Sequence, residues 1–217
     1  MTIRVVIVDD HPVVRQGLKM MLDSENDIEV CGEAAKVQEA ISVIENIDPD
    51  VVTVDLSLSG DVSGIELVKK INDRFPSTKS LVLSMHDESL YAERVIRAGA
   101  RGYVMKKEAM DNVIGAIRKI MKGEIFLSED ISGKIIDKLL HGSSDSMDTP
   151  VNILANKEFE VFQLLGNGFS SREIADKMNI SINTIESHKR NIKEKLKLRN
   201  SSELIKHAVQ WVLTQTQ

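Results

Sequence analysis

Five short apolar runs constrain the fold of this chain most strongly, because each is followed by a stretch in which apolar residues recur at helical spacing. The runs are rich in β-branched residues and apolar throughout, as in strands that are buried on both faces. They cover residues 3–8, 28–32, 51–54, 80–83 and 102–105. Strands that alternate with helices in this way predict an α/β fold with a doubly wound, five-stranded parallel sheet.

The intervening helices are predicted from apolar residues three or four positions apart. In the first helix these residues are Val13, Val14, Leu18, Met21 and Leu22. Pro49, Pro76 and Gly99 are expected to end the second, third and fourth helices. Residues 127–140 show one more helical pattern, for which Ser128 is the expected N-cap.

The composition changes after this pattern. Residues 142–150 are small and polar and end in Pro150, which is typical of a linker. Four helical patterns follow without a strand signal, at 156–166, 171–178, 182–196 and 201–213. We therefore predict an α/β domain over residues 1–124, an extra helix and linker over 125–151, and a small all-α domain over 152–217.

Charge is divided unevenly between these parts. Residues 1–125 carry 16 Lys and Arg against 21 Asp and Glu, whereas residues 151–217 carry 10 against 7. An acidic first part and a basic last part favour an anionic partner, such as nucleic acid, for the C-terminal domain.

The sequence also indicates in which cellular compartment the protein is expected. Cys31 is the single cysteine and cannot form an internal disulfide, which fits a reducing compartment. The N-terminal residues lack the long apolar core of a signal peptide. No apolar run approaches the roughly 20 residues that a membrane span needs. We expect a cytoplasmic protein without a membrane partner.

Polar residues stand at the carboxyl ends of four predicted strands. Asp9 and Asp10 follow the first strand, Asp55 the third, Ser84 ends the fourth and Lys106 follows the fifth. Because these ends share one edge of a parallel sheet, the side chains should converge. Three carboxylates in one pocket repel each other unless a divalent cation neutralises them, and oxygen ligands suit Mg²⁺. An aspartate in such a pocket can accept a phosphoryl group.

The motifs around these residues resemble receiver domains, over about residues 3–122. They are Val8-Asp9-Asp10-His11, Val54-Asp55-Leu56, Leu83-Ser84 and Gly102-Tyr103-Val104-Met105-Lys106. The resemblance implies a flavodoxin-like fold in which Asp55 is the phosphoacceptor of a sensor histidine kinase. It implies that Ser84 and Lys106 contact the phosphoryl group. Tyr103 would be an aromatic switch that turns inward when Ser84 moves.

The same resemblance implies a magnesium site. Asp10 would bind Mg²⁺ directly and Asp9 largely through water, with Asp55 and the backbone carbonyl of Ser57 as further ligands. The loop after Asp55 departs from the usual pattern, since 58–60 reads Leu-Ser-Gly where Met-Pro-Gly is common. No proline follows Lys106 either, so the cis bond that is common there in the family would cost about 3 kcal/mol.

The C-terminal domain contains a pattern typical of a helix-turn-helix. Ser170 and Glu173 form a predicted capping box at the start of a short helix. The turn 179–181 follows, and Ser181 is the expected cap of a longer helix. In such a motif the second helix lies in the major groove of DNA. Ile185, Ile192 and Leu196 are expected to pack inward.

Motifs across all four C-terminal helices resemble the LuxR-type domain of NarL/FixJ-family response regulators, over about residues 152–210. The matching residues are Leu154, Glu158, Glu160-Val161, Gly168, Glu173-Ile174-Ala175, Ser181, Thr184-Ile185, His188, Ile192 and Lys195-Leu196. The resemblance implies binding to double-stranded DNA through the polar side of the second helix. The predicted DNA-binding residues are Thr184, Glu186, Ser187, Lys189, Arg190 and Lys193, with Lys189 and Lys193 near phosphates.

Together these features predict a DNA-binding transcription regulator that is controlled by phosphorylation and dimerises when phosphorylated. It would catalyse only its own phosphorylation and dephosphorylation. One alternative is an aspartyl-phosphate phosphatase, but the run Asp55-Leu56-Ser57 lacks a second carboxylate to act as acid. Two further alternatives are a phosphate-independent adaptor, which the intact acidic set disfavours, and a sensor of a small acyl ligand, which the strand-helix alternation disfavours.

Overall fold

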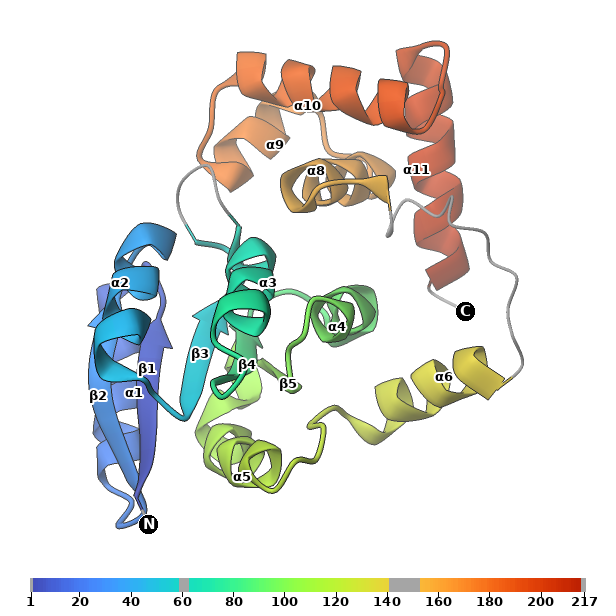
Figure 1. Ribbon diagram of the computed structural model, residues 1–217. Coiled ribbons are helices and arrows are strands. Elements are labelled where there is room, and N and C mark those ends of the chain that lie inside the picture. Colours follow the sequence, from blue (N-terminus) through green and yellow to red (C-terminus); the bar gives the residue numbers. More distant parts are fainter. Residues whose placement is uncertain (1, 59–62, 141–152, 216–217) are drawn as a thin grey trace. The chain divides into compact units, whose positions relative to one another are not determined.

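The computed structural model describes residues 2–58, 63–140 and 153–215 of the chain (Figure 1). They belong to two compact units, Met1–Ser143 and Ser144–Gln217. The predicted linker at 142–150 lies outside the described residues. In the described part of the chain, no helix is both long and apolar enough to cross a membrane.

The first unit is built on a five-stranded parallel sheet, as the sequence predicts. Its strands are β1 (Ile3–Val8), β2 (Ile28–Ala34), β3 (Val51–Asp55), β4 (Lys79–Ser84) and β5 (Gly102–Met105). They lie in the order β2-β1-β3-β4-β5, and every pairing is parallel. This order brings the ends of β1, β3 and β4 side by side, where the predicted acidic residues stand.

Four helices connect the strands, and a fifth follows β5. They are α1 (Pro12–Asp23), α2 (Val37–Ile47), α3 (Gly64–Arg74), α4 (Glu88–Arg97) and α5 (Ala109–Met121). The apolar sides of α1 and α5 join one face of the sheet in a single buried cluster, and Figure 1 shows α2, α3 and α4 on the other side. Val13 lies in the predicted helix, but it is 83% exposed because it is on the outer side of α1.

The predicted helix ends agree with the structure. The helix α2 ends at Ile47 and is capped by Asp48, which has a left-handed φ of 50° and directly precedes Pro49. The helix α3 ends at Arg74, and its C-cap residue Phe75 precedes Pro76. Gly99 follows α4 with a φ of 107°, and a Cβ there would collide with the side chain of Asn72. Glycine is therefore needed at position 99 for both its conformation and its lack of a side chain.

The chain beyond α5 stays attached to the first unit. Phe126 pairs with Gly102 of β5, and the Tyr103 amide donates to the Phe126 carbonyl at 2.9 Å. The next helix is α6 (Glu129–Leu140), and the Ile131 amide donates to Ser128 Oγ at 3.4 Å, which confirms the predicted cap. The Ser128 amide itself donates to Glu88 Oε1 of α4 at 2.9 Å.

The second unit is all-helical, with α8 (Asn156–Gly166), α9 (Ser171–Met178), α10 (Ile182–Lys195) and α11 (Ser201–Gln215). Its core residues are fully buried and include Phe159, Phe162, Ile174, Ile185, Ile192, Leu204 and Ala208. Ser170 and Glu173 form the predicted capping box. The turn into α10 passes through Asn179, with a left-handed φ of 52°. The helices α9 and α10 therefore form the expected helix-turn-helix.

Candidate functional site

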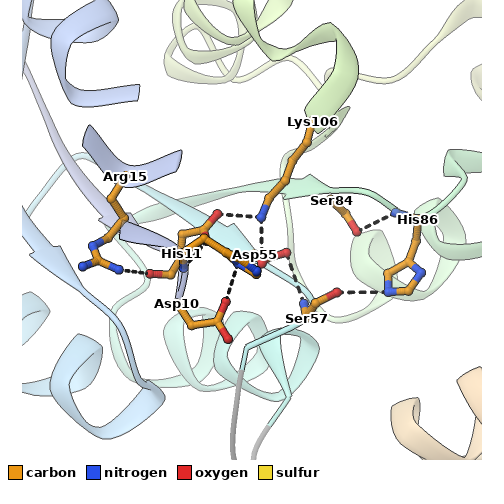
Figure 2. Close-up of polar contacts among 9 residues, drawn as sticks. Asp10, His11, Arg15, Asp55, Ser57, Ser84, His86 and Lys106 are labelled. Atoms are coloured by element: carbon orange, nitrogen blue, oxygen red, sulfur yellow. Dashed lines mark hydrogen bonds and ion pairs between the residues drawn. The ribbon is translucent and has the colours of Figure 1, made fainter. Parts of the chain in front are cut away.

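The predicted acidic residues converge at the carboxyl edge of the sheet. Asp9 at the end of β1 and Asp55 at the end of β3 are each 2% exposed, and Ser84 at the end of β4 is fully buried. Lys106, just after β5, reaches toward Asp55 (Figure 2). Parallel strands explain this convergence, because they deliver their last residues to the same edge.

Lys106 is the cation of this pocket. Its Nζ lies 2.6 Å from Asp9 Oδ2 and 2.8 Å from Asp55 Oδ2. Burial raises the pKa of Asp55, and Lys106 counteracts that rise. Burial also opposes the charge on Lys106, but the two carboxylates outweigh it and raise the pKa of the ammonium above its ordinary value. The ammonium therefore stays protonated beside the carboxylates.

The donor set of this pocket suits Mg²⁺. One ligand atom from each of Asp9, Asp10, His11 and Asp55 can be chosen so that all lie within 4.8 Å of one another. Three of these groups are carboxylates, which are the hard oxygen ligands that Mg²⁺ prefers. The imidazole of His11 lies 2.8 Å from Asp10 Oδ1 and is mostly exposed. It is better suited to orienting Asp10 than to binding a hard cation.

The loop after Asp55 begins within reach of the acceptor. The Ser57 amide donates to Asp55 Oδ1 at 3.1 Å, and Ser57 Oγ lies 3.1 Å from His86 Nε2. The His86 ring stacks on Tyr91 of α4, with centroids 4.7 Å apart. Residues 59–62, which carry most of the departure from the family pattern, lie outside the described residues. The peptide bond after Lys106 is trans.

Tyr103 is buried and bound to the segment that follows β4. Its hydroxyl donates to the His86 carbonyl at 2.8 Å, and the His86 amide donates to Ser84 Oγ at 3.1 Å. Burial raises the pKa of Tyr103 above its ordinary range, so the phenol stays protonated and acts as a donor. The Tyr103 ring therefore lies inside the protein in this structure. Ser84 and Tyr103 are linked through one residue, His86.

The polar side of α10 carries the six predicted DNA-binding residues. Thr184, Glu186 and Arg190 are exposed, while Ser187, Lys189 and Lys193 are half-buried. Ser181 caps the helix by accepting from the Thr184 amide at 3.1 Å. Ile185 and Ile192 are fully buried, as predicted, and Leu196 is half-buried.

Four of these six residues already make side-chain hydrogen bonds within the protein. Thr184 Oγ1 lies 2.9 Å from Ser181 Oγ, and Ser187 Oγ donates to the Asn183 carbonyl at 3.0 Å, while Glu186 and Lys189 bind each other. Lys189 Nζ donates to Glu186 Oε1 at 2.8 Å and to Ser171 Oγ at 3.1 Å. In this structure Glu186 accepts from Lys189 at i,i+3. Ser171 was missed as a partner: in the sequence it is only part of the capping-box motif, and its contact with α10 depends on how two helices pack.

Comparison with known proteins agrees with both units. A family model for the response regulator receiver domain matches residues 5–118. A second model, for bacterial regulatory proteins of the luxR family, matches residues 152–208. The two matches fall on the two units that carry the acidic pocket and the helix-turn-helix.

Relatives match the chain over nearly its whole length. The oxygen regulatory protein NreC of Staphylococcus aureus is 37% identical over 209 residues, which is 95% of this chain and 96% of NreC. RcsB of Salmonella enterica serovar Typhimurium, solved on promoter DNA with the phosphomimetic BeF3-, is 32% identical, with a TM-score of 0.60. That match covers 96% of this chain and 98% of RcsB.

A structure of two RcsB dimers bound to two parallel DNAs is 31% identical to this chain. It covers 100% of both chains, with a TM-score of 0.58. The receiver match spans more than half of the chain, and the similarity to NreC extends through both units. The chain therefore belongs to the NarL/FixJ family of response regulators, which join a receiver domain to a LuxR-type domain.

Proposed function

We propose that this protein is a transcription regulator that is switched when Asp55 accepts a phosphoryl group from a sensor histidine kinase in the cytoplasm. One observation carries the proposal. The Asp55 carboxylate is buried at the end of β3, where the Ser57 amide holds one oxygen and the Lys106 ammonium holds the other. A carboxylate restrained in this way is positioned to act as a nucleophile.

In the proposed transfer, an oxygen of Asp55 forms a bond to phosphorus while the N–P bond of the kinase phosphohistidine breaks. The electron pair of that bond returns to the imidazole nitrogen, which takes up a proton. Lys106 stays protonated and can follow the phosphoryl oxygens, so that a cation remains beside the new charge. Ser84 can offer its hydroxyl to the same group.

Asp9, Asp10, Asp55 and the Ser57 carbonyl are the residues that would hold Mg²⁺. When bound, the ion would offset the charge on the transferred phosphoryl group. The three carboxylates support this assignment, because a single lysine cannot balance three negative charges.

The signal can leave the site through Ser84. In the present structure the Ser84 hydroxyl accepts from the His86 amide, and the His86 carbonyl accepts from Tyr103. A Ser84 side chain that turned to a phosphoryl group would give up its bond to His86. The segment between β4 and α4 would then rearrange together with Tyr103. Phosphorylation favours the active state only as far as the phosphoryl group binds that state better.

For the second unit we propose binding to double-stranded DNA as a homodimer, with α10 in the major groove. The solved RcsB complexes, which contain dimers and DNA, support this. Thr184, Ser187 and Arg190 are candidates for base edges, because Thr184 and Arg190 are exposed and Ser187 lies between them. Lys193, one turn further, is a candidate for a phosphate.

A direct experiment tests the acceptor. Wild-type protein is incubated with Mg²⁺ and acetyl phosphate, and its intact mass is measured. We expect the mass of one phosphoryl group on the wild type, none on Asp55→Asn, and wild-type behaviour of Asp111→Asn, which changes an exposed aspartate of α5. Equal phosphorylation of Asp55→Asn and the wild type would show that another residue is the acceptor.

A further inference from the structure

Three side chains close a triangle of polar contacts between the two helices of the helix-turn-helix. Lys189 Nζ donates to Glu186 Oε1 at 2.8 Å and to Ser171 Oγ at 3.1 Å. Ser171 Oγ donates to the same Glu186 oxygen at 2.8 Å. Ser171 is the first residue of α9, and the other two lie on α10. The triangle therefore fastens the start of α9 to the middle of α10.

The contacts leave little of the lysine for other partners. The Lys189 side chain is 13% exposed, whereas that of Glu186 is 53% exposed. The hydrogen bonds from Lys189 and Ser171 lower the pKa of Glu186, so its carboxylate is ionised and the two charges offset each other. A surface pair of this kind on one helix stabilises it little. Here the added bond to Ser171 restrains the angle between two helices.

The other two basic residues of this surface are in a different situation. Among the residues that the structure describes, no carboxylate lies within ion-pair distance of Arg190 or Lys193. Arg190 is exposed on α10. Only these two cations of the central part of α10 can meet a phosphate or a base without first breaking an internal ion pair.

We propose that Lys189 and Glu186 are positioning residues, which hold α9 and α10 at the angle that DNA binding requires, and that Lys189 is not a phosphate contact. This inference rests on the proposed function of α10 as the helix that enters the major groove. It revises the role that the sequence predicts for Lys189. It also explains how an acidic residue can stand on a DNA-binding helix, since Glu186 is neutralised before DNA arrives.

The salt dependence of binding separates the two roles. Each protein cation that neutralises a DNA phosphate releases counterions and increases the salt slope, the magnitude of the fall of log affinity with log salt, by about 0.9. Lys193→Met should therefore lower the slope by about one unit. Lys189→Met should lower the affinity for a specific site but leave the slope unchanged. Glu186→Gln frees the Lys189 ammonium, so the slope should rise by about one unit, with tighter binding to scrambled DNA.

The experiment uses the full-length protein and two DNA duplexes, one selected by the protein from a random pool and one scrambled. Affinities are measured at several salt concentrations for the wild type, Lys189→Met, Glu186→Gln and Lys193→Met. The exchanged pair, Glu186→Lys with Lys189→Glu, is the rescue control: it restores opposite charges and should recover most of the specific affinity lost in Lys189→Met. Lys189→Arg should also keep it.

The outcomes distinguish this inference from the function on which it rests. A slope that falls by the same amount in Lys189→Met and Lys193→Met makes Lys189 a phosphate contact and overturns the inference. Failure of the exchanged pair to recover specificity also counts against it. If Lys193→Met and Arg190→Met change neither slope nor affinity, α10 does not contact DNA, and the proposed function is overturned instead.

Discussion

The ammonium of Lys106 lies 2.8 Å from the carboxylate of Asp55, and the lysine side chain is only 10% exposed. The same ammonium also contacts Asp9. When one partner of a buried ion pair is removed, the other is left with an uncompensated charge away from water. The stability of the free receiver domain therefore depends on Lys106, in addition to any role of this residue in phosphorylation.

Lys106→Met should lower the free energy of unfolding by about 3–5 kcal/mol at neutral pH without Mg²⁺. The matched control is Lys107→Met, at the neighbouring position. The Lys107 side chain is 64% exposed, so its replacement should change the free energy of unfolding by less than about 0.5 kcal/mol. Urea denaturation measures both. Added Mg²⁺ should recover part of the loss in Lys106→Met, because the ion replaces the missing cation. Similar losses in the two variants would contradict the assignment of Lys106.

The pH dependence of this loss follows from Asp55. Burial raises the pKa of Asp55 above its ordinary value of 3.8, and Lys106→Met removes the main opposing effect. A carboxyl group whose pKa is raised by folding favours the folded state below 3.8, and that contribution is lost as pH rises through the folded value. The stability gap between Lys106→Met and the wild type should therefore narrow as pH falls. A gap that widens in acid would refute this reasoning.

The contact between Ser57 and His86 predicts a coupled effect on the aspartyl phosphate. Their side chains share one hydrogen bond of 3.1 Å beside Asp55. Ser57→Ala and His86→Ala each remove that bond and give water easier access, so each should shorten the phosphoryl half-life, by about fivefold if the bond is worth about 1 kcal/mol.

The double variant should decay at nearly the same rate as the single ones, since the bond can be lost only once. Decay is followed by intact mass after acetyl phosphate is removed. Ser42→Ala, an exposed serine of α2, is the control. Effects that multiply in the double variant would mean that the two residues act independently.

His188 predicts a pH effect in the second unit. Burial lowers the pKa of this histidine below its ordinary value of 6.5. A histidine of this kind stabilises the fold above 6.5, and the contribution is lost as pH falls through the lowered value. The wild type should lose stability in that window, and His188→Gln should lose less. The single tryptophan, Trp211, packs against Phe159 in this unit, so its fluorescence reports the transition. If the free energy of unfolding fell equally steeply with decreasing pH in the wild type and in His188→Gln, this account would be contradicted.

The strands and the acidic pocket could be predicted from the sequence because both depend on local patterns. Continuous β-branched runs give strand bounds within two residues of the observed ones, as with β2, which extends to Ala34. Parallel strands then place Asp9, Asp55 and Lys106 at one edge without further information. The strand pattern predicts only that these residues lie at the same edge of the sheet. That Lys106 contacts both Asp9 and Asp55 depends on side-chain geometry, which the pattern does not give.

Contacts between helices could not be predicted in the same way. Lys189 and Ser171 lie 18 positions apart, and their bond exists only because α9 and α10 cross at a particular angle. Val13 shows the same limit, since its spacing fits a buried position but the direction of α1 exposes it. Spacing along a helix identifies a face, and packing decides what that face contacts.

A hydrogen bond between two helices also connects α4 of the receiver to the start of α6. The carboxylate of Glu88, the first residue of α4, accepts from the Ser128 amide at 2.9 Å. The amides at the start of a helix lack acceptors within it, and a carboxylate there is also favoured by the helix dipole. Glu88 thus supplements the cap of α6 from another helix. The start of α4 directly follows the segment that links Ser84 to Tyr103.

Glu88→Ala should free the first turn of α6 without unfolding the receiver. If the cap is worth about 1 kcal/mol, amide hydrogen exchange over residues 128–132 should be about fivefold faster. Glu66→Ala is the matched control, since Glu66 is an exposed first-turn glutamate of α3. Acetyl phosphate should speed exchange at these amides in the wild type. It should have less effect in Glu88→Ala, because the hydrogen bond between Ser128 and Glu88 is already lost. Unchanged exchange in Glu88→Ala would mean that Ser128 and the Phe126 pairing hold α6 unaided.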